Sequence, residues 1–333
     1  MLGVVAAAVA VAAVDVAVLV ATRNGTPAAD AQGAGANLVA VIDPTTSRVV
    51  ERVHVGRMPT TVVAGYGGAW VLNKDDETLT HLDARSHHVV DTVRLDVTPI
   101  GLAVGAGGVW FSGRPEGDVH DPREFTKLER IDPATDHVDR AFDSHTSAYA
   151  FAVGGNALWS TGIMAGHVRG TARSDARTGA MRKLDIQMYG DMIAADETAA
   201  YWVSTGSHVA RVSTRTGRLT RVLPLVSDAS LAAGHVPPNP TAVAIGGGAV
   251  WISAIDGSLI RVDSNLRRVV TRIPVCRYAL AVAYGEGAVW VACGDRTVVR
   301  VDPKTDRPGA AIDVGALPRG IAVADGTVWV TLN

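Results

Sequence analysis

The sequence has few cysteines, few aromatic residues and no excess of charge. Its 333 residues include two cysteines and 5% aromatics, and 31 basic side chains are balanced by 33 acidic ones, which gives a net charge of −2. A nucleic-acid-binding surface needs clustered Lys and Arg, and no such cluster stands out, so nucleic acid is not an expected partner. Long amphipathic helices are scarce, whereas glycine is plentiful, with 35 residues. The composition favours an all-β fold with many turns.

The beginning of the chain lacks basic residues but carries a long apolar run. The twenty residues 2–21 contain a single charged side chain, that of Asp15. A helix of this length extends roughly 30 Å, the thickness of the hydrocarbon core of a bilayer. We predict a transmembrane helix over residues 1–22, a flexible linker over 23–36 and one folded domain over 37–333. One alternative is a cleaved secretory signal ending at 34–36, although the basic region that normally begins such a signal is missing, and another is a segment that does not enter the membrane.

Tryptophan is the clearest repeated feature. All seven tryptophans follow short runs of small and β-branched residues, and they recur every 39–49 residues. They are Trp70, Trp110, Trp159, Trp202, Trp251, Trp290 and Trp329. A period of about 40 residues with strand-like contents is typical of a β-propeller, in which each repeat forms one four-stranded blade. We therefore predict seven blades, with the tryptophans packed between them.

The rest of the repeat consists of turn-forming residues at fixed distances from the tryptophan. Four repeats have a proline eleven positions before it, namely Pro59, Pro99, Pro240 and Pro318. The third strand of six repeats ends at an aspartate, namely Asp43, Asp83, Asp132, Asp175, Asp263 and Asp302. An aspartate that begins a turn can accept hydrogen bonds from the backbone just after it. We therefore interpret these aspartates as turn formers and not as metal ligands.

The two ends of the folded domain each contain half of a repeat. After the linker the chain begins with a third and a fourth strand, and it finishes with a first and a second strand over 317–333. Neither end is a complete blade. We predict that the two ends together form the seventh blade, because this arrangement pairs strand edges that would otherwise be exposed.

The repeat pattern resembles a known family. Proline, an apolar run, Gly-x-Gly and tryptophan, followed by phrases such as "RIDPAT" (130–135) and "RVDPKT" (300–305), are similar to the YVTN and virginiamycin B lyase-like seven-bladed propellers. The similarity covers residues 37–333. Close relatives often follow a single transmembrane helix in membrane-bound regulators of GC-rich bacteria. The resemblance therefore implies a non-catalytic sensor or interaction propeller, anchored in the cell membrane by one span.

The same resemblance raises an enzymatic alternative, a streptogramin B lyase-like enzyme. Lyase chemistry in this family implies histidines just after the repeat prolines, with a glutamate and a divalent cation nearby. Those positions hold Thr60, Ile100, Tyr149, Met192, Thr241, Leu280 and Arg319. Without a histidine there, elimination has no general base, so we expect no catalytic residue, metal or cofactor. A quinone-dependent dehydrogenase, another propeller chemistry, generally needs larger loops than this chain offers.

The long connections of the predicted propeller fall on one face. They are residues 112–127, 160–170 and 227–240. Variable loops confined to one face of a scaffold indicate a binding site. Residues near the first strands would surround the axis on this face, and the candidate ligand-binding residues are Arg57, Tyr149, Asp191, Arg277, Tyr278 and Arg319. Arginines there could bind a carboxylate or sulfate of a small molecule, glycan or protein; alternatively, they are solvated charges.

The two cysteines fall in the same repeat. Cys276 precedes its first strand and Cys293 follows its second, so both should lie at the same end of one hairpin. We name them as a candidate disulfide, which would need an oxidising compartment and would place the propeller outside the membrane. Two small buried thiols are the alternative.

Overall fold

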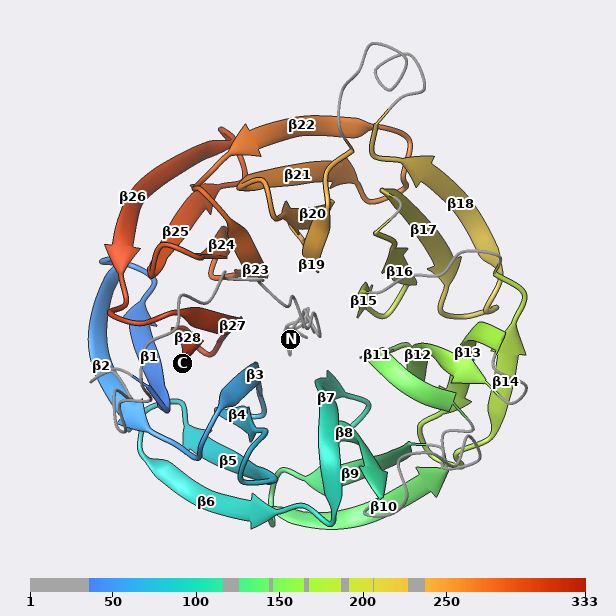
Figure 1. The fold of residues 1–333 in the computed structure, drawn as a ribbon. Coiled ribbons are helices and arrows are strands. Elements are labelled where there is room, and N and C mark those ends of the chain that lie inside the picture. The colour runs from blue at the N-terminus through green and yellow to red at the C-terminus, as the bar shows by residue number, and fades with distance from the viewer. Residues whose placement is uncertain are drawn as a thin grey trace, which may run out of the picture.

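The structure is a seven-bladed β-propeller. It is a computed structural model that describes residues 36–115, 126–143, 146–164, 168–186, 192–205, 207–226 and 237–333. Seven four-stranded antiparallel sheets surround a central axis (Figure 1). All regular secondary structure in these ranges is β-strand. The predicted all-β fold, with its seven blades of four strands, is confirmed.

Six blades are each built from four consecutive strands, the first of which lies nearest the axis (Figure 1). Blade 1 contains β3 (Pro59–Gly65), β4 (Gly68–Asn73), β5 (Thr78–Asp83) and β6 (Val89–Arg94). Blade 2 contains β7 (Val97–Gly105), β8 (Gly108–Pro115), β9 (Lys127–Asp132) and β10 (His137–Asp143). Blade 3 contains β11 (Thr146–Gly154), β12 (Ala157–Met164), β13 (Val168–Asp175) and β14 (Met181–Leu184).

The second half of the ring repeats this order. Blade 4 contains β15 (Met192–Ala195), β16 (Ala199–Val203), β17 (His208–Ser213) and β18 (Leu219–Pro224). Blade 5 contains β19 (Pro240–Gly246), β20 (Ala249–Ala254), β21 (Ser258–Asp263) and β22 (Val269–Pro274). Blade 6 contains β23 (Ala279–Gly285), β24 (Ala288–Cys293), β25 (Thr297–Asp302) and β26 (Arg307–Asp313).

The closing blade joins the two ends of the chain. It combines β27 (Pro318–Ala324) and β28 (Thr327–Leu332) with β1 (Leu38–Asp43) and β2 (Arg48–His54). Strands β28 and β1 pair antiparallel from Leu38 opposite Leu332 to Ile42 opposite Val328. The predicted closure is therefore present, and it leaves no gap in the ring between blades 6 and 1.

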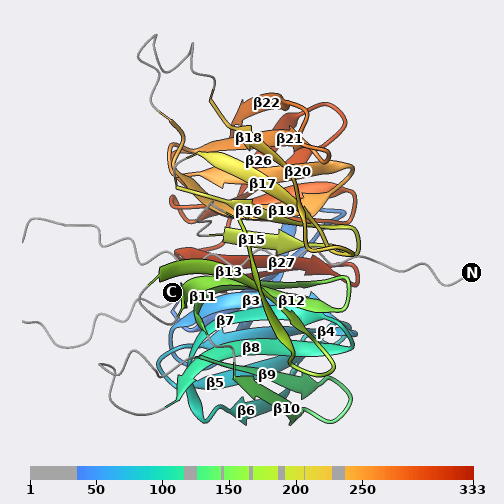
Figure 2. The same cartoon turned by 90° about the vertical axis from the view of Figure 1, so that its right-hand side faces the viewer.

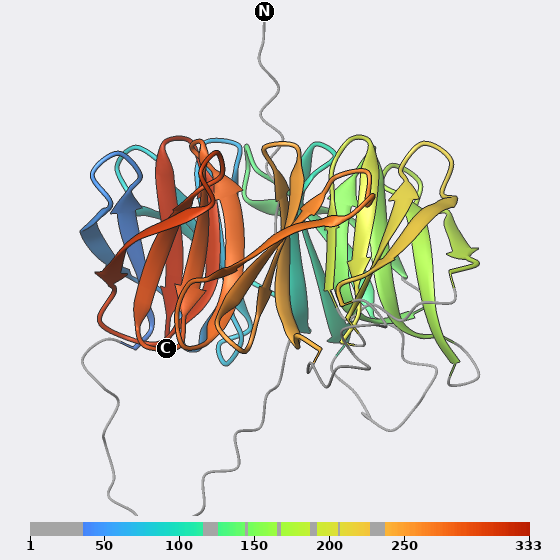
Figure 3. The same cartoon turned by 90° about the horizontal axis from the view of Figure 1, so that it is seen from above.

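The strands run between two faces that differ in their connections. The hairpin face carries the turns from first to second and from third to fourth strand, and it is uppermost in Figure 3. The connection face carries the turns from second to third strand and the links between blades. Figure 2 shows the strands spanning the thickness of the disc between the two faces.

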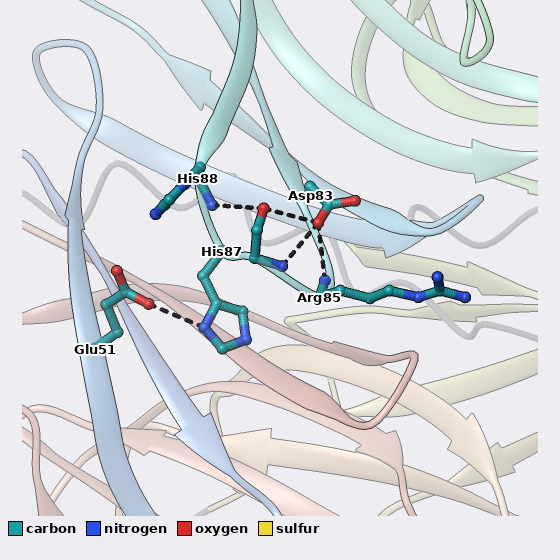
Figure 4. Close-up of polar contacts among 6 residues, drawn as sticks. Glu51, Asp83, Arg85, His87 and His88 are labelled. Carbon is teal, nitrogen blue, oxygen red and sulfur yellow. Dashed lines mark hydrogen bonds and ion pairs between the residues drawn. The ribbon is translucent and has the colours of Figure 1, made fainter.

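Aspartates form the turns of the hairpin face, as the sequence predicts. In blade 1 the Asp83 carboxylate accepts hydrogen bonds from the backbone N–H groups of Arg85 (3.1 Å) and Ser86 (2.7 Å) (Figure 4). Asp175 of blade 3 accepts the N–H groups of Arg177 and Thr178 in the same way. These backbone donors, that of Ser86 first, hold the pKa of Asp83 below its ordinary value, because they stabilise the charged carboxylate.

The tryptophans fill the seams between blades. All seven are completely buried. In blades 2, 3, 5 and 6 the indole N–H donates to the carbonyl of a glycine five residues earlier, at 2.9–3.3 Å. The same glycine position allows the inner strands of neighbouring blades to pack closely. In blade 2, a Cβ on Gly105 would lie 2.9 Å from the Val153 side chain of blade 3. The repeated phrase thus encodes the packing of one blade on the next.

Some expectations fall outside the described residues, and one needs correction. Residues 1–35, which include the predicted transmembrane helix, lie outside them, as do 116–125 and 227–236 in two predicted long loops. The search for a helix long and apolar enough to cross a membrane, made over the residues described, finds none. In the third predicted loop, 160–170, the described residues 160–164 and 168–170 instead continue strands β12 and β13, which pair from Ser160 opposite Ala172 to Met164 opposite Val168.

Candidate functional site

The inner strands carry β-bulges where they begin on the connection face. In six blades the pairing of first and second strands slips just after the first residues, at Thr60, Ile100, Tyr149, Thr241, Leu280 and Arg319–Gly320. A bulge releases its extra residue from the ladder and redirects that side chain, and such bulges are common beside binding sites. The candidate ligand residues Tyr149 and Arg319 both lie on these bulges.

The repeat prolines account for four of the six bulges. Pro59, Pro99, Pro240 and Pro318 each immediately precede a bulge. Proline has no N–H to donate to a neighbouring strand and is confined to strand starts, edges and bulges. For four of the six bulges the sequence signal was therefore the proline eleven positions before the tryptophan, whereas the bulges at Tyr149 and Leu280 follow an alanine.

Arg57 is tied to an acidic partner that the sequence did not reveal. Its Nε lies 2.6 Å from Oδ1 of Asp76, and its backbone N–H donates to Oδ2 of the same carboxylate, also at 2.6 Å. Asp76 lies in the turn between β4 and β5. The backbone N–H of Arg57, followed by its side chain, lowers the pKa of Asp76. The side chain of Arg57 remains 65% exposed, but its charge is neutralised, so it clamps the start of blade 1.

Arg277 and Tyr278 form an exposed pair at the start of blade 6. The Arg277 guanidinium carbon lies 5.2 Å from the centre of the Tyr278 ring, and residue Tyr278 is 42% exposed. The carbonyl of Tyr278 accepts the N–H of Gly294 at 2.8 Å. This geometry combines a cation with an open aromatic surface, which suits ligands that have both an anionic and an apolar part.

A disulfide fixes this pair from one side. Cys276 and Cys293 are joined in the structure, with Cα atoms 6.3 Å apart, and Cys293 is completely buried. The N–H of Cys276 also donates to the carbonyl of Gly257 in blade 5, at 3.2 Å. The segment that carries Arg277 and Tyr278 is therefore held both by its own hairpin and by the neighbouring blade.

Arg319 lies on the next inner strand, β27, and is exposed. The adjoining Gly320 donates its N–H to Oγ1 of Thr331 at 2.8 Å. A Cβ on Gly320 would lie 2.9 Å from the carbonyl oxygen of Thr60, so β27 and β3 approach closely at this bulge. Arg277, Arg319 and Arg57 thus belong to three consecutive blades: blade 6, the closing blade and blade 1.

We call Arg57, Arg277, Tyr278 and Arg319 the arginine arc. Ion pairs of Arg277 or Arg319 are absent from the described part of the chain, in contrast to Arg57. Of the other two candidates, Tyr149 belongs to β11 in blade 3, and its side chain lies outside the described structure. Asp191 lies outside the described residues altogether. The structure therefore brings four of the six candidate residues onto one side of the connection face.

A buried carboxylate in blade 2 was not predicted. Glu129 lies on β9 with 8% of its surface exposed, and burial raises the pKa of its carboxyl group. Corresponding positions of the other third strands include Thr80, Ala172 and Ile260. Within the described residues there is no group of three or more potential metal ligands.

Comparison with known proteins gives the fold and no more. No family model matches the chain, and no curated protein matches it. Among solved structures, the chain is similar to the computationally designed Ika8 protein, with a TM-score of 0.55 and 13% identity. The match covers 84% of this chain and 98% of the designed protein. At this identity the likeness supports the propeller architecture alone.

Proposed function

We propose that this chain is a non-catalytic binding propeller of the YVTN and virginiamycin B lyase-like type, anchored in the cell membrane by residues 1–22. The apolar composition of residues 2–21 supports the anchor. The seven blades and the repeat phrases support the family. In this proposal the propeller acts as an extracytoplasmic sensor, and the arginine arc receives its ligand.

The observation that carries the proposal is the exposed Arg277–Tyr278 pair, held by a disulfide beside Arg319 of the adjacent blade. Guanidinium groups bind carboxylate and sulfate through paired hydrogen bonds, and their uncompensated charge favours an anion. The Tyr278 ring offers an apolar surface to the rest of the ligand. The ligand is therefore a carboxylated or sulfated small molecule, glycan or protein segment.

The disulfide supports the extracytoplasmic location, because such bonds persist in oxidising compartments and are rare in the cytosol. The residues at the bulges support the absence of catalysis. Thr60, Leu280 and Arg319 occupy positions where lyase chemistry would need an imidazole base. Turnover of a streptogramin B in the presence of Mg²⁺ would contradict this part of the proposal.

Titration of the full-length chain, purified in detergent, tests the proposal. The probes are citrate and a sulfated heparin oligosaccharide, which present carboxylates and sulfates. We expect saturable binding of at least one probe, weakened at least tenfold in an Arg277→Gln/Arg319→Gln double variant. Arg85→Gln is the matched control, since Arg85 is an exposed arginine on the opposite, hairpin face. Equal affinities for the wild type and the double variant would refute a role for the arc.

A further inference from the structure

An arginine recurs at the hairpin-face end of the third strands. Five blades have one two residues before the turn, namely Arg130, Arg173, Arg211, Arg261 and Arg300. In blades 5 and 6 its guanidinium lies over the tryptophan of the same blade, with Arg261 5.2 Å from the Trp251 ring and Arg300 5.9 Å from the Trp290 ring. These two arginines therefore occupy matching places in successive seams.

In the seam between blades 5 and 6, a carboxylate neutralises the charge of the arginine. Nη1 of Arg261 lies 2.9 and 3.1 Å from the two carboxylate oxygens of Asp306 and 2.9 Å from the carbonyl of Pro303. Asp306 is the fourth residue after Asp302, in the turn between β25 and β26, and has a φ of 57°. The turn of one blade thus supplies the counter-charge for the arginine of the blade before it.

The seam between blade 6 and the closing blade lacks this counter-charge. Ser47, with a φ of 55°, is the fourth residue after Asp43 and occupies the turn position that corresponds to Asp306. No ion pair of Arg300 occurs within the described ranges, and its buried Nε has no hydrogen-bond partner there. The two seams therefore differ at this turn position, where one has the carboxylate of Asp306 and the other has the hydroxyl of Ser47.

A cavity of about 460 Å³ opens at this place. Its charged lining consists of Arg48, Arg300, Arg307 and Asp302, and the hydroxyl-bearing Ser47 also contributes. The Asp302 carboxylate already accepts the N–H of Lys304 at 2.7 Å, and this backbone bond lowers the pKa of Asp302. Positive charge therefore exceeds negative charge in a cavity large enough for a small organic molecule.

We propose that the cavity between blade 6 and the closing blade binds the phosphate group of a small molecule. The phosphate takes the place that the Asp306 carboxylate has in the preceding seam and pairs with Arg300. Arg48 and Arg307 contribute the further positive charge that a doubly charged oxyanion requires, and Arg side chains bind phosphate through two parallel hydrogen bonds. This site lies on the hairpin face and is independent of the arginine arc.

Calorimetric titration of the full-length chain at low ionic strength tests the site, with inorganic phosphate and glycerol 3-phosphate as probes. We expect one phosphate per chain, and tighter binding of the monoester would indicate that the cavity also holds the organic part. Ser47→Asp supplies the missing carboxylate and should weaken binding at least tenfold. Arg300→Gln should also weaken phosphate binding at least tenfold, and it adds no charge to the turn.

Asp306→Ser provides a gain-of-function control. This variant removes the carboxylate that pairs with Arg261 in the seam between blades 5 and 6. In that seam, Arg268 and Arg307 occupy the positions that Arg307 and Arg48 occupy in the proposed site. We expect the number of phosphates bound to rise from one to two. Absence of saturable binding by either probe, or unchanged affinity in both Ser47→Asp and Arg300→Gln, would overturn the proposal. Loss of binding only in Arg277→Gln/Arg319→Gln would assign the phosphate to the arginine arc instead.

Discussion

The Nδ1 atom of His87 lies 3.0 Å from a carboxylate oxygen of Glu51 and so connects blade 1 to the closing blade (Figure 4). The same imidazole packs edge-on against Trp329, with ring centres 5.5 Å apart. Glu51 belongs to the N-terminal strand β2 and Trp329 to the C-terminal strand β28. In the closing blade, Val41 occupies the position that holds an arginine in five other blades. The tryptophan of the closing blade, Trp329, is instead contacted by His87 of blade 1.

Replacement of His87 should weaken the closure of the ring. His87→Ala removes a partly exposed imidazole–carboxylate hydrogen bond and an aromatic contact, so we expect the free energy of unfolding to fall by about 1 kcal/mol. Denaturant unfolding followed by tryptophan fluorescence measures the change. His88→Ala is the matched control, because His88 is the adjacent histidine and is exposed. The same loss in both variants would show that His87 has no special role.

Removal of the disulfide should destabilise blade 6 and loosen the arginine arc. Cys276 and Cys293 are 17 residues apart in the sequence, and a bridge of this span stabilises a protein by roughly 2–4 kcal/mol. We expect Cys276→Ser/Cys293→Ser to unfold at lower temperature than the wild type. Reductant should lower the wild-type midpoint and leave the variant unchanged. Equal midpoints of oxidised and reduced wild type would contradict the bridge.

The turn aspartates should make the protein sensitive to acid. Backbone N–H donors lower the pKa values of Asp83 and Asp175 below the ordinary 3.8, so both carboxylates stabilise the fold while charged. Their contribution is complete above that ordinary value and is lost as pH falls through the lowered values. Unfolding midpoints measured from pH 6 to pH 2.5 should fall less steeply in Asp83→Asn/Asp175→Asn than in the wild type. Parallel curves would contradict the effect.

The buried Glu129 should cost stability at neutral pH. Burial raises the pKa of its carboxyl group, so the charged form that prevails above the ordinary pKa is disfavoured in the fold. We expect Glu129→Gln to raise the free energy of unfolding at pH 7 by about 1 kcal/mol, with the gain vanishing in acid. Glu197→Gln, which changes an exposed glutamate, is the control. A gain that persists at pH 3 would point to packing and not to charge.

The fold was predictable because its signals are local and repeated. The tryptophan recurs in all seven repeats, the turn aspartate in six and the proline in four, so the copies reinforce one interpretation. The prediction of a long connection over 160–170 was wrong, since residues 160–164 and 168–170 pair as parts of β12 and β13. A pattern of single residues does not show how far a hairpin extends.

The site was less predictable because it depends on contacts between blades and between turns. Arg57 was expected to be a free cation, and nothing in the spacing showed that Asp76 would neutralise it. The lack of an acidic partner for Arg300 was not predictable either, because it depends on Ser47 of another blade, which occupies the turn position that corresponds to Asp306. Such pairings follow from the arrangement of the ring, which a linear pattern does not contain.

Arginine modification read by mass spectrometry tests the central claim most directly. Phenylglyoxal labels exposed arginines, and the full-length chain can be labelled with and without the sulfated heparin oligosaccharide. We expect the oligosaccharide to protect Arg277 and Arg319 at least severalfold and to leave Arg85 on the hairpin face unprotected. Protection of Arg85 alone, or equal labelling of all three arginines in both conditions, would contradict a binding function for the connection face.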